Sequence, residues 1–114
     1  MFAVEIRPSD AQYQPTGTID VENGADGPVL HMRGDVDAPV VQRFEAEQAV
    51  DRRSIVAVEF SEMAYIDSIG LSLLVRWAQD RTSAGQAAVI RNANERVERV
   101  LYIAGIESMF VRED

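Results

Sequence analysis

The stretch that most constrains this chain lies near its centre, where residues 54–60 read SIVAVEF. This run is β-branched and apolar with little alternation, which is typical of a strand covered on both faces inside a parallel sheet. Because neighbouring parallel strands are joined by a crossover, usually a helix, such a strand needs helices before and after it. The run therefore predicts an α/β fold, and it is the best candidate for the central strand.

A helix is predicted directly after Ser68. Its apolar positions follow the i, i+3, i+4, i+7 spacing of one helical face, at Leu71, Leu74, Val75 and Ala78. Gly85 stands beyond the expected end of the helix, where glycine is a common terminator. This helix is the expected crossover from the central strand to the next one.

The segment before the central run predicts a hairpin and a helix. Strand-like runs at 18–22 and 29–33 flank the letters NGADGP, whose residue types supply turn conformations. Asp37 can cap the following helix and Pro39 fits its first turn, so we expect that helix to run to about Val50.

The segment after the Ser68 helix predicts a strand at 86–91, a helix and a final strand at 108–111. Asn94 can cap that helix, and Gly105 follows its expected end. Its apolar positions are Val97, Val100, Leu101 and Ala104. The whole order predicts an α/β fold with a small mixed β-sheet of about five strands backed by three to four helices.

A single domain is predicted over residues 17–114, because a chain of 114 residues leaves no room for a second core. Residues 1–16 alternate at Phe2, Val4 and Ile6 and then meet two prolines. An N-terminal arm and a short edge strand are both compatible with that pattern.

The composition excludes several classes of function. A formal net charge of -8 argues against direct binding of nucleic acid or an anionic membrane, and it favours a basic surface on another protein. The chain has no cysteine, which excludes disulfides and thiolate metal sites and agrees with a reducing compartment. The sequence shows neither a signal peptide nor a run of about 20 apolar residues, so we expect a cytoplasmic protein without membrane insertion.

The same residues argue against an enzyme and against a bound cofactor. The letters DSIG around Ser68 lack the Gly-x-Ser-x-Gly elbow of a hydrolase, and no Gly-x-x-x-x-Gly-Lys loop is present for a nucleotide. The only histidine, His31, falls in a hairpin strand, where a surface or partly buried role is favoured over that of a catalytic base. Asp35 and Asp37 form a close acidic pair, but the letters after them do not continue a Ca²⁺ loop. We therefore predict no metal site and assign this pair to a turn and a helix cap.

Ser68 is the strongest candidate for a functional residue. We expect it at or near the N-cap of its helix, at an end of the sheet where α/β proteins meet ligands and partners. A helix start has unpaired N–H groups and a partial positive charge, so it tolerates a phosphate there. The phosphate would add about -1.5 to -2 charge at pH 7 beside Asp67, near Asp35 and Asp37, and would repel a bound partner. Ser68 is thus predicted to be a phosphorylation switch.

A second candidate surface lies on the same helix. At roughly 100° per residue, Ile69, Leu73 and Trp77 are expected on the side opposite to the core. An apolar stripe centred on a tryptophan is typical of a protein contact surface. Three alternatives stay open: the N-terminal arm covers the stripe, a second copy covers it, or the helix is rotated from this estimate.

The letters RGDVDAP, YIDSIGLSLL and VERVLYIAGI resemble the STAS domain and, more narrowly, the bacterial anti-sigma factor antagonists. The resemblance covers roughly residues 17–110. The Gly-x-x-Asp element of the family corresponds to Gly34 through Asp37, and its helix ending corresponds to Gly105 and Ile106. Family members often carry a second Ser or Thr after the phosphorylated residue, where this chain has Ile69.

The resemblance implies a partner-switching regulator, an anti-anti-sigma factor, of the kind used in stress responses. In that family the hydroxyl directly after the Asp is phosphorylated by a partner that is both a serine kinase and an anti-sigma factor, and this position is Ser68 here. The unphosphorylated form binds the kinase and frees the sigma factor, and a PP2C-type phosphatase restores it. The predicted partner-binding residues are Asp35, Asp37, Asp67, Ser68, Ile69, Gly70, Leu73 and Trp77.

Two other functions are compatible with the same sequence. One is a non-switching STAS subunit or scaffold that binds a transporter or a signalling complex, in which Ser68 only begins a helix. The other is a binder of a nucleotide or another small anion at the helix start.

Overall fold

The computed structural model describes residues 17–48 and 50–113, and the predicted N-terminal arm or edge strand lies outside these residues. The strands are β1 (Thr18–Gly24), β2 (Gly27–Val36), β3 (Ala57–Ile66), β4 (Val89–Arg91) and β5 (Val111–Glu113). The α-helices are α2 (Ala38–Glu47), α3 (Ser68–Ser83) and α4 (Glu95–Ile103). Two short 3₁₀ helices, η1 (Arg52–Ser54) and η2 (Glu107–Met109), precede β3 and β5.

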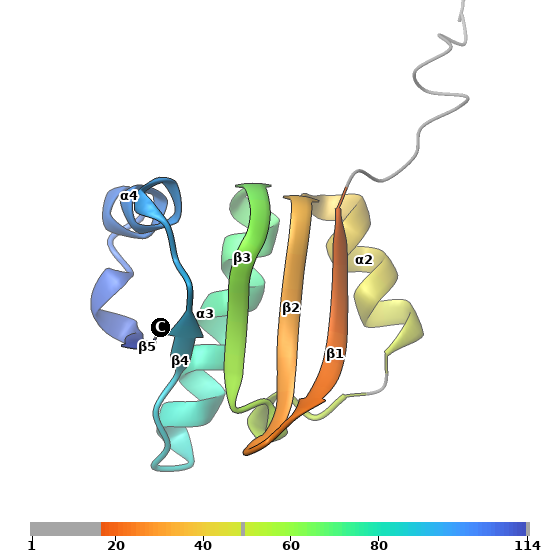
Figure 1. The fold of residues 1–114 in the computed structure, drawn as a ribbon, viewed down its shortest axis with the longest axis vertical. Coiled ribbons are helices and arrows are strands. Elements are labelled where there is room, and N and C mark those ends of the chain that lie inside the picture. The colour runs from red at the N-terminus through yellow and green to blue at the C-terminus, as the bar shows by residue number, and fades with distance from the viewer. Residues whose placement is uncertain (1–16, 49, 114) are drawn as a thin grey trace, which may run out of the picture.

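The strands form one mixed sheet in the order β1-β2-β3-β4-β5. β1 and β2 make an antiparallel hairpin, and the other three neighbouring pairs are parallel. β3 lies in the middle of the sheet, and α2 and α3 lie behind the strands in the view of Figure 1. The predicted five-stranded mixed sheet with helices and a central strand in this segment is confirmed.

The ends of several elements differ from the prediction. β3 begins at Ala57 because η1 takes up residues 52–54, where the Asp51 carboxylate accepts the Arg53 N–H at 3.0 Å. β3 also continues beyond the apolar run to Ile66, because its pairing with β2 continues that far. At the other end of the chain, η2 occupies the first half of the range predicted for the final strand, and β5 begins only at Val111. The length of β3 is therefore set by its pairing with β2 and not by its local sequence.

One face of the sheet is not covered by a helix of the described residues (Figure 1). On that face the Arg33 guanidinium lies 3.0 Å from Glu22 of β1 and 3.3 Å from Glu62 of β3. His31 is half-buried there, with its Nε2 atom 3.5 Å from Glu22, in agreement with its predicted strand role. The prediction that the central strand is covered on both faces is therefore wrong for this part of β3, because ion pairs across three strands occupy the second face.

Glu59 of β3 also lies at this face and is half-buried. Partial burial opposes its ionisation, but hydrogen bonds from Asn92 and from the Ser61 N–H outweigh that effect and lower the pKa of the Glu59 carboxyl. The ionised carboxylate of Glu59 is thus favoured on this face of the sheet.

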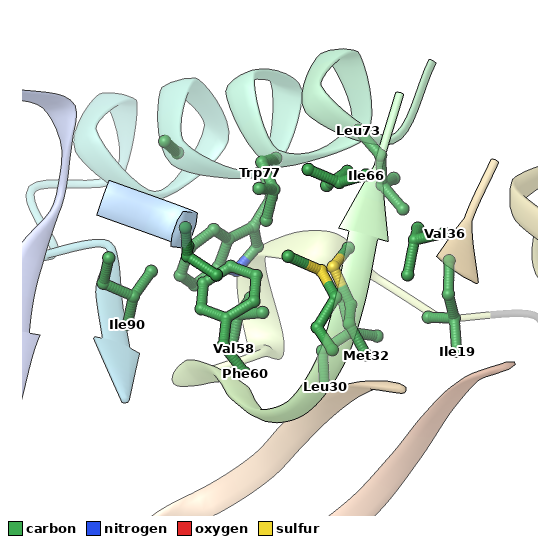
Figure 2. Packing of buried hydrophobic residues seen from close by; sticks show 14 of the residues in the cluster. Ile19, Leu30, Met32, Val36, Val58, Phe60, Ile66, Leu73, Trp77 and Ile90 are labelled. Atoms are coloured by element: carbon green, nitrogen blue, oxygen red, sulfur yellow. The ribbon is translucent and has the colours of Figure 1, made fainter. Parts of the chain in front are cut away.

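The core lies between the helix-facing side of the sheet and α3. Figure 2 shows side chains of β2 and β3 directed toward this helix. They include Leu30, Met32, Val58 and Phe60, each at most 2% exposed. Because the core is confined to one face of the sheet, the orientation of α3 decides which of its apolar residues reach solvent.

The predicted orientation of the Ser68 helix is wrong. Leu73 and Trp77, which were expected to face away from the core, are 2% and 1% exposed. The Trp77 ring stacks on Phe110 with centroids 6.4 Å apart, and its Nε1 donates to the Ile55 carbonyl oxygen at 3.0 Å. Only Ile69 of the predicted stripe is exposed, at 43%. Leu73 and Trp77 are therefore core residues and not a contact surface.

The physical reason is the width of the apolar surface of α3. Its buried positions are Gly70, Leu73, Leu74, Trp77, Ala78 and Arg81. Leu71 and Val75, which were expected near the middle of the core face, are half-buried at its border. Leu74 and Ala78 face the core in both the predicted and the observed orientation of α3, so the spacing of apolar residues alone does not distinguish the two orientations. Burial of the large Trp77 ring removes the most apolar area from water in the observed rotation.

Candidate phosphorylation and partner-binding site

The carboxyl ends of β2 and β3 meet at the end of the sheet from which α2 and α3 begin (Figure 1). The last residue pair of the two strands is Val36 and Ile66, and the Asp67 N–H donates to the Val36 carbonyl oxygen at 3.0 Å. Asp37 then caps α2, with its Oδ1 accepting the Val40 N–H at 3.3 Å. Candidate residues from two distant segments therefore lie together, and the predicted cap role of Asp37 is confirmed.

Asp67 joins the starts of the two helices. Its Oδ1 accepts the N–H groups of Ile69 and Gly70, each at 2.9 Å, and so caps α3. Its Oδ2 accepts the N–H of Ala38, the first residue of α2, at 3.0 Å. A single half-buried carboxylate thus orients α2 and α3 relative to each other.

The capping side chain of α3 is Asp67, and Ser68 is the first residue of the helix. The predicted placement of Ser68 at or near the cap is therefore confirmed. The expectation of unpaired N–H groups is wrong for Ile69 and Gly70, because both donate to Asp67. A phosphate on Ser68 would be favoured by the helix dipole, which the Asp67 charge partly offsets, and those two amides would not bind it.

Ser68 is exposed at the surface, directly before the exposed Ile69. A kinase has to reach the hydroxyl with its own active site, and this position leaves it accessible. The apolar side chain of Ile69 beside it offers contact area to a protein partner. These two residues carry the surface-exposed part of the predicted site on α3.

Gly70 is buried at the point where α3 passes closest to the strand ends. A Cβ atom there would lie 2.6 Å from the Ile66 Cγ1 and 3.0 Å from the Val36 carbonyl oxygen. The first distance is shorter than real Cβ atoms show, and the second is tighter than most Cβ contacts. Gly70 therefore serves the site by spacing, since it lets the first turn of α3 lie against both strands.

Gly70→Ala is expected to lower the free energy of unfolding by about 1–3 kcal/mol, because the added methyl group collides with the buried Ile66 side chain and lies tightly against the Val36 carbonyl oxygen. Urea unfolding of the variant and the parent chain measures this difference. Ser72→Ala, at an exposed position of the same helix, is the matched control and should change stability little. Equal stability of Gly70→Ala and Ser72→Ala would contradict the close packing of Gly70.

Asp35 and Asp37 lie at the end of β2, opposite a bulge in β3. Asp35 is a residue of β2, so the prediction that it belongs to a turn is wrong. Gly34 has a φ of 65°, and the register between β2 and β3 shifts between Gly34 and Asp35. Asp35 then pairs with Tyr65 of β3, and Asp35 and Asp37 are both half-buried. The end of β2 thus places both residues at the same end of the sheet as Ser68.

Tyr65 is a candidate that the sequence interpretation did not select. Its side chain is 56% exposed, and it lies opposite Asp35 and three residues before Ser68. Exposed tyrosines are enriched in protein interfaces. The available signal was an aromatic residue two positions before the Asp-Ser pair, but the predicted strand ended at Phe60 and left Tyr65 outside it.

The structure brings most of the predicted site residues to one end of the sheet, namely Asp35, Asp37, Asp67, Ser68, Ile69 and Gly70. It places Leu73 and Trp77 in the core. Within residues 17–48 and 50–113, no group of three acidic or histidine side chains could hold a metal ion. None of the helices in that part of the chain is long and apolar enough to cross a membrane.

Solved structures of bacterial regulators share this fold. The anti-sigma factor antagonist SpoIIAA in its unphosphorylated form is 15% identical, and the match covers 85% of this chain and 89% of SpoIIAA with a TM-score of 0.66. The Bacillus cell fate determinant SpoIIAA in its phosphorylated form is also 15% identical, with coverage of 85% and 92% and a TM-score of 0.61. A putative anti-sigma factor antagonist from Thermotoga maritima is 19% identical, with coverage of 84% and 86% and a TM-score of 0.63.

The family model described as "Mlab, STAS domain" matches residues 19–112, which is most of the chain. This match agrees with the five-stranded sheet, with the Asp67–Ser68 connection from β3 to α3, and with the similarity to the three solved structures. The chain belongs to the STAS domain family.

Proposed function

We propose that this protein is an anti-sigma factor antagonist that works by partner switching. In its unphosphorylated form it binds a protein that is both a serine kinase and an anti-sigma factor, and it thereby frees the sigma factor for transcription. Phosphorylation of Ser68 releases the kinase, and a PP2C-type phosphatase reverses the modification. The protein acts as substrate and binding module and not as an enzyme, and the proposed compartment is the cytoplasm, where sigma factors work.

The observation that carries this proposal is the position of Ser68, exposed at the first residue of α3 between the Asp67 cap and the exposed Ile69. The hydroxyl is accessible to a kinase, while the helix start beneath it is already capped without it. A phosphate therefore leaves the capping hydrogen bonds in place, and its charge of about -1.5 to -2 is directed at a bound partner. The effect of the modification falls on the interface and not on the fold.

Phosphorylation in vitro tests the proposal directly. Purified anti-sigma kinases from the source genome are incubated with the chain and ATP, and mass spectrometry locates the phosphate. We expect modification on Ser68, its absence in Ser68→Ala, and its retention in Ser72→Ala, since Ser72 is exposed one turn further along α3. Absence of modification at Ser68 with every such kinase would contradict the switch.

A non-switching STAS subunit or scaffold of a transporter or signalling complex is the second candidate. It is supported by the description of the matching family model, which is Mlab and not an antagonist. In that case Ile69→Asp would abolish binding of the partner, whereas Ser68→Asp would leave it unchanged. A nucleotide or small anion at the start of α3 has less support, because the Ile69 and Gly70 amides already donate to Asp67.

A further inference from the structure

A small groove lies beside the Ser68 end of β3, between this strand and α4. β4 pairs with β3 only at residues 57–59, so the remaining edge of β3 on that side has no strand neighbour within the described part of the chain. Met63, Ile66, Val97 and Val100 line the groove with apolar side chains. The Arg96 guanidinium of α4 bridges to the strand edge through a hydrogen bond to the Ala64 carbonyl oxygen at 3.2 Å.

The size and lining of the groove indicate what it can accept. Its volume of about 110 Å³ is well below the roughly 300–1,000 Å³ of sites for small molecules and cofactors. Its floor is buried and apolar, with Met63 and Ile66 each 6% exposed and Val97 4% exposed. Its rim is open to solvent at Ala64 and Tyr65. These dimensions suit one aliphatic side chain presented by another protein.

The groove is continuous with the proposed kinase-binding site. Ile66, which forms part of its floor, is two residues before Ser68, and Tyr65 at its rim pairs with Asp35. A specific protein interface covers about 800 Å² on each partner, far more than the area of one serine and its neighbours. A partner that reaches the Ser68 hydroxyl therefore also covers the end of β3 that borders the groove.

The charge around the groove indicates the chemistry of its occupant. Within the described part of the chain, Arg96 is the one charged side chain that lines the groove, and its guanidinium donates to the Ala64 carbonyl oxygen. The carboxylates lie beyond the lining: Asp67 directly follows Ile66, and Asp35 and Asp37 lie at the same end of the sheet. The chain as a whole carries a formal charge of -8. Basic side chains on the partner complement these carboxylates. A second copy of this chain would instead bring a matching set of carboxylates against them.

We propose that the groove between β3 and α4 receives an aliphatic side chain of the same kinase that modifies Ser68, flanked on the kinase by arginine or lysine. This inference rests on the proposed function and extends it, since the groove makes the partner recognise α4 as well as α3. Docking in the groove holds the kinase over Ser68 without touching the hydroxyl. Its loss should therefore weaken association and leave the transfer step unchanged.

Ala64→Glu tests the groove, because Ala64 is exposed at the rim and its substitution removes no core side chain. With the purified anti-sigma kinase and ATP, we expect the KM for this chain to rise at least about tenfold while kcat stays within about twofold. In Ala64→Glu the rise comes from obstruction of the apolar groove alone, because a carboxylate attracts a basic partner. Ala64→Arg should raise KM further, because it both obstructs the groove and repels a basic partner. Ala25→Glu, in the exposed hairpin turn at the opposite end of the sheet, carries the same charge change and should leave both constants unchanged.

Tyr65→Ser is a second variant, in case a charge at residue 64 disturbs β3. Because Tyr65 is exposed, this substitution reduces the contact area at the rim of the groove and removes no core side chain. If the parent chain is phosphorylated on Ser68 and the variants at 64 and 65 match Ala25→Glu, the groove inference is overturned and the proposed function stands. If the parent chain is not phosphorylated on Ser68, both are overturned. Sedimentation that shows a dimer broken by Ala64→Glu would assign the groove to a second copy and also overturn the inference.

Discussion

Ser68→Asp is expected to weaken binding of the proposed kinase about 100-fold, which corresponds to about 2.8 kcal/mol. The substitution places a permanent carboxylate at the first residue of α3, beside Asp67 and on the surface that the kinase covers. The thermal midpoint should hardly change or should rise slightly, because an acidic residue in the first turn of a helix is favoured by about 0.3–1 kcal/mol. Isothermal calorimetry with the kinase and thermal unfolding of the free chain measure the two quantities.

Two variants isolate the effect of charge at this position. Ser68→Ala should bind the kinase with nearly parental affinity, since it removes the phosphorylation site without adding charge. Ala25→Asp adds the same charge at the exposed hairpin turn and should not affect binding. If Ser68→Asp binds as tightly as the parent chain, the non-switching alternative is supported. If Ser68→Asp unfolds, the start of α3 does not tolerate a negative charge.

Trp77→Ala is expected to reduce the free energy of unfolding by about 3–5 kcal/mol, a large share of the roughly 5–15 kcal/mol available to a domain. The variant loses the stacking on Phe110 and leaves a cavity under α3. It also leaves the Ile55 carbonyl oxygen without its indole donor. Urea unfolding followed by circular dichroism measures the loss.

Trp77→Phe separates packing from the hydrogen bond. It keeps an aromatic ring against Phe110 and removes the indole N–H, so its cost should be smaller, about 1–3 kcal/mol for the unpaired carbonyl. A Trp77→Ala variant that kept parental stability but no longer bound the kinase would contradict the buried position of Trp77. It would support the predicted contact surface instead. Such a result would mean that α3 is rotated from the orientation described above.

The fold could be predicted from the sequence because its signals are local. The SIVAVEF run, the helical spacing after Ser68 and the turn letters of the hairpin each reflect residues close together in the chain. The rotation of α3 could not be predicted in the same way. Leu74 and Ala78 fit two orientations, and the choice depends on how Trp77 packs with Phe110, a residue of a distant segment.

The site could be predicted in part for the same reason. The Asp-Ser pair at the helix start is a local pattern, and the prediction located Ser68 correctly relative to α3. The bond from the Ala38 N–H to Asp67 connects residues 29 apart in sequence, so no local pattern indicated that Asp67 links two helices. The exposed Tyr65 was missed because β3 continues only through its pairing with β2.

The single tryptophan of this chain is buried in the core between α3 and the sheet, nine residues after Ser68. Its fluorescence therefore reports on the interior of the domain and not on the binding surface. A tryptophan-free kinase that docks rigidly at Ser68 should leave the emission maximum unchanged, whereas a red shift on binding would mean that the core itself loosens. The protein thus carries an intrinsic optical probe that distinguishes docking from remodelling.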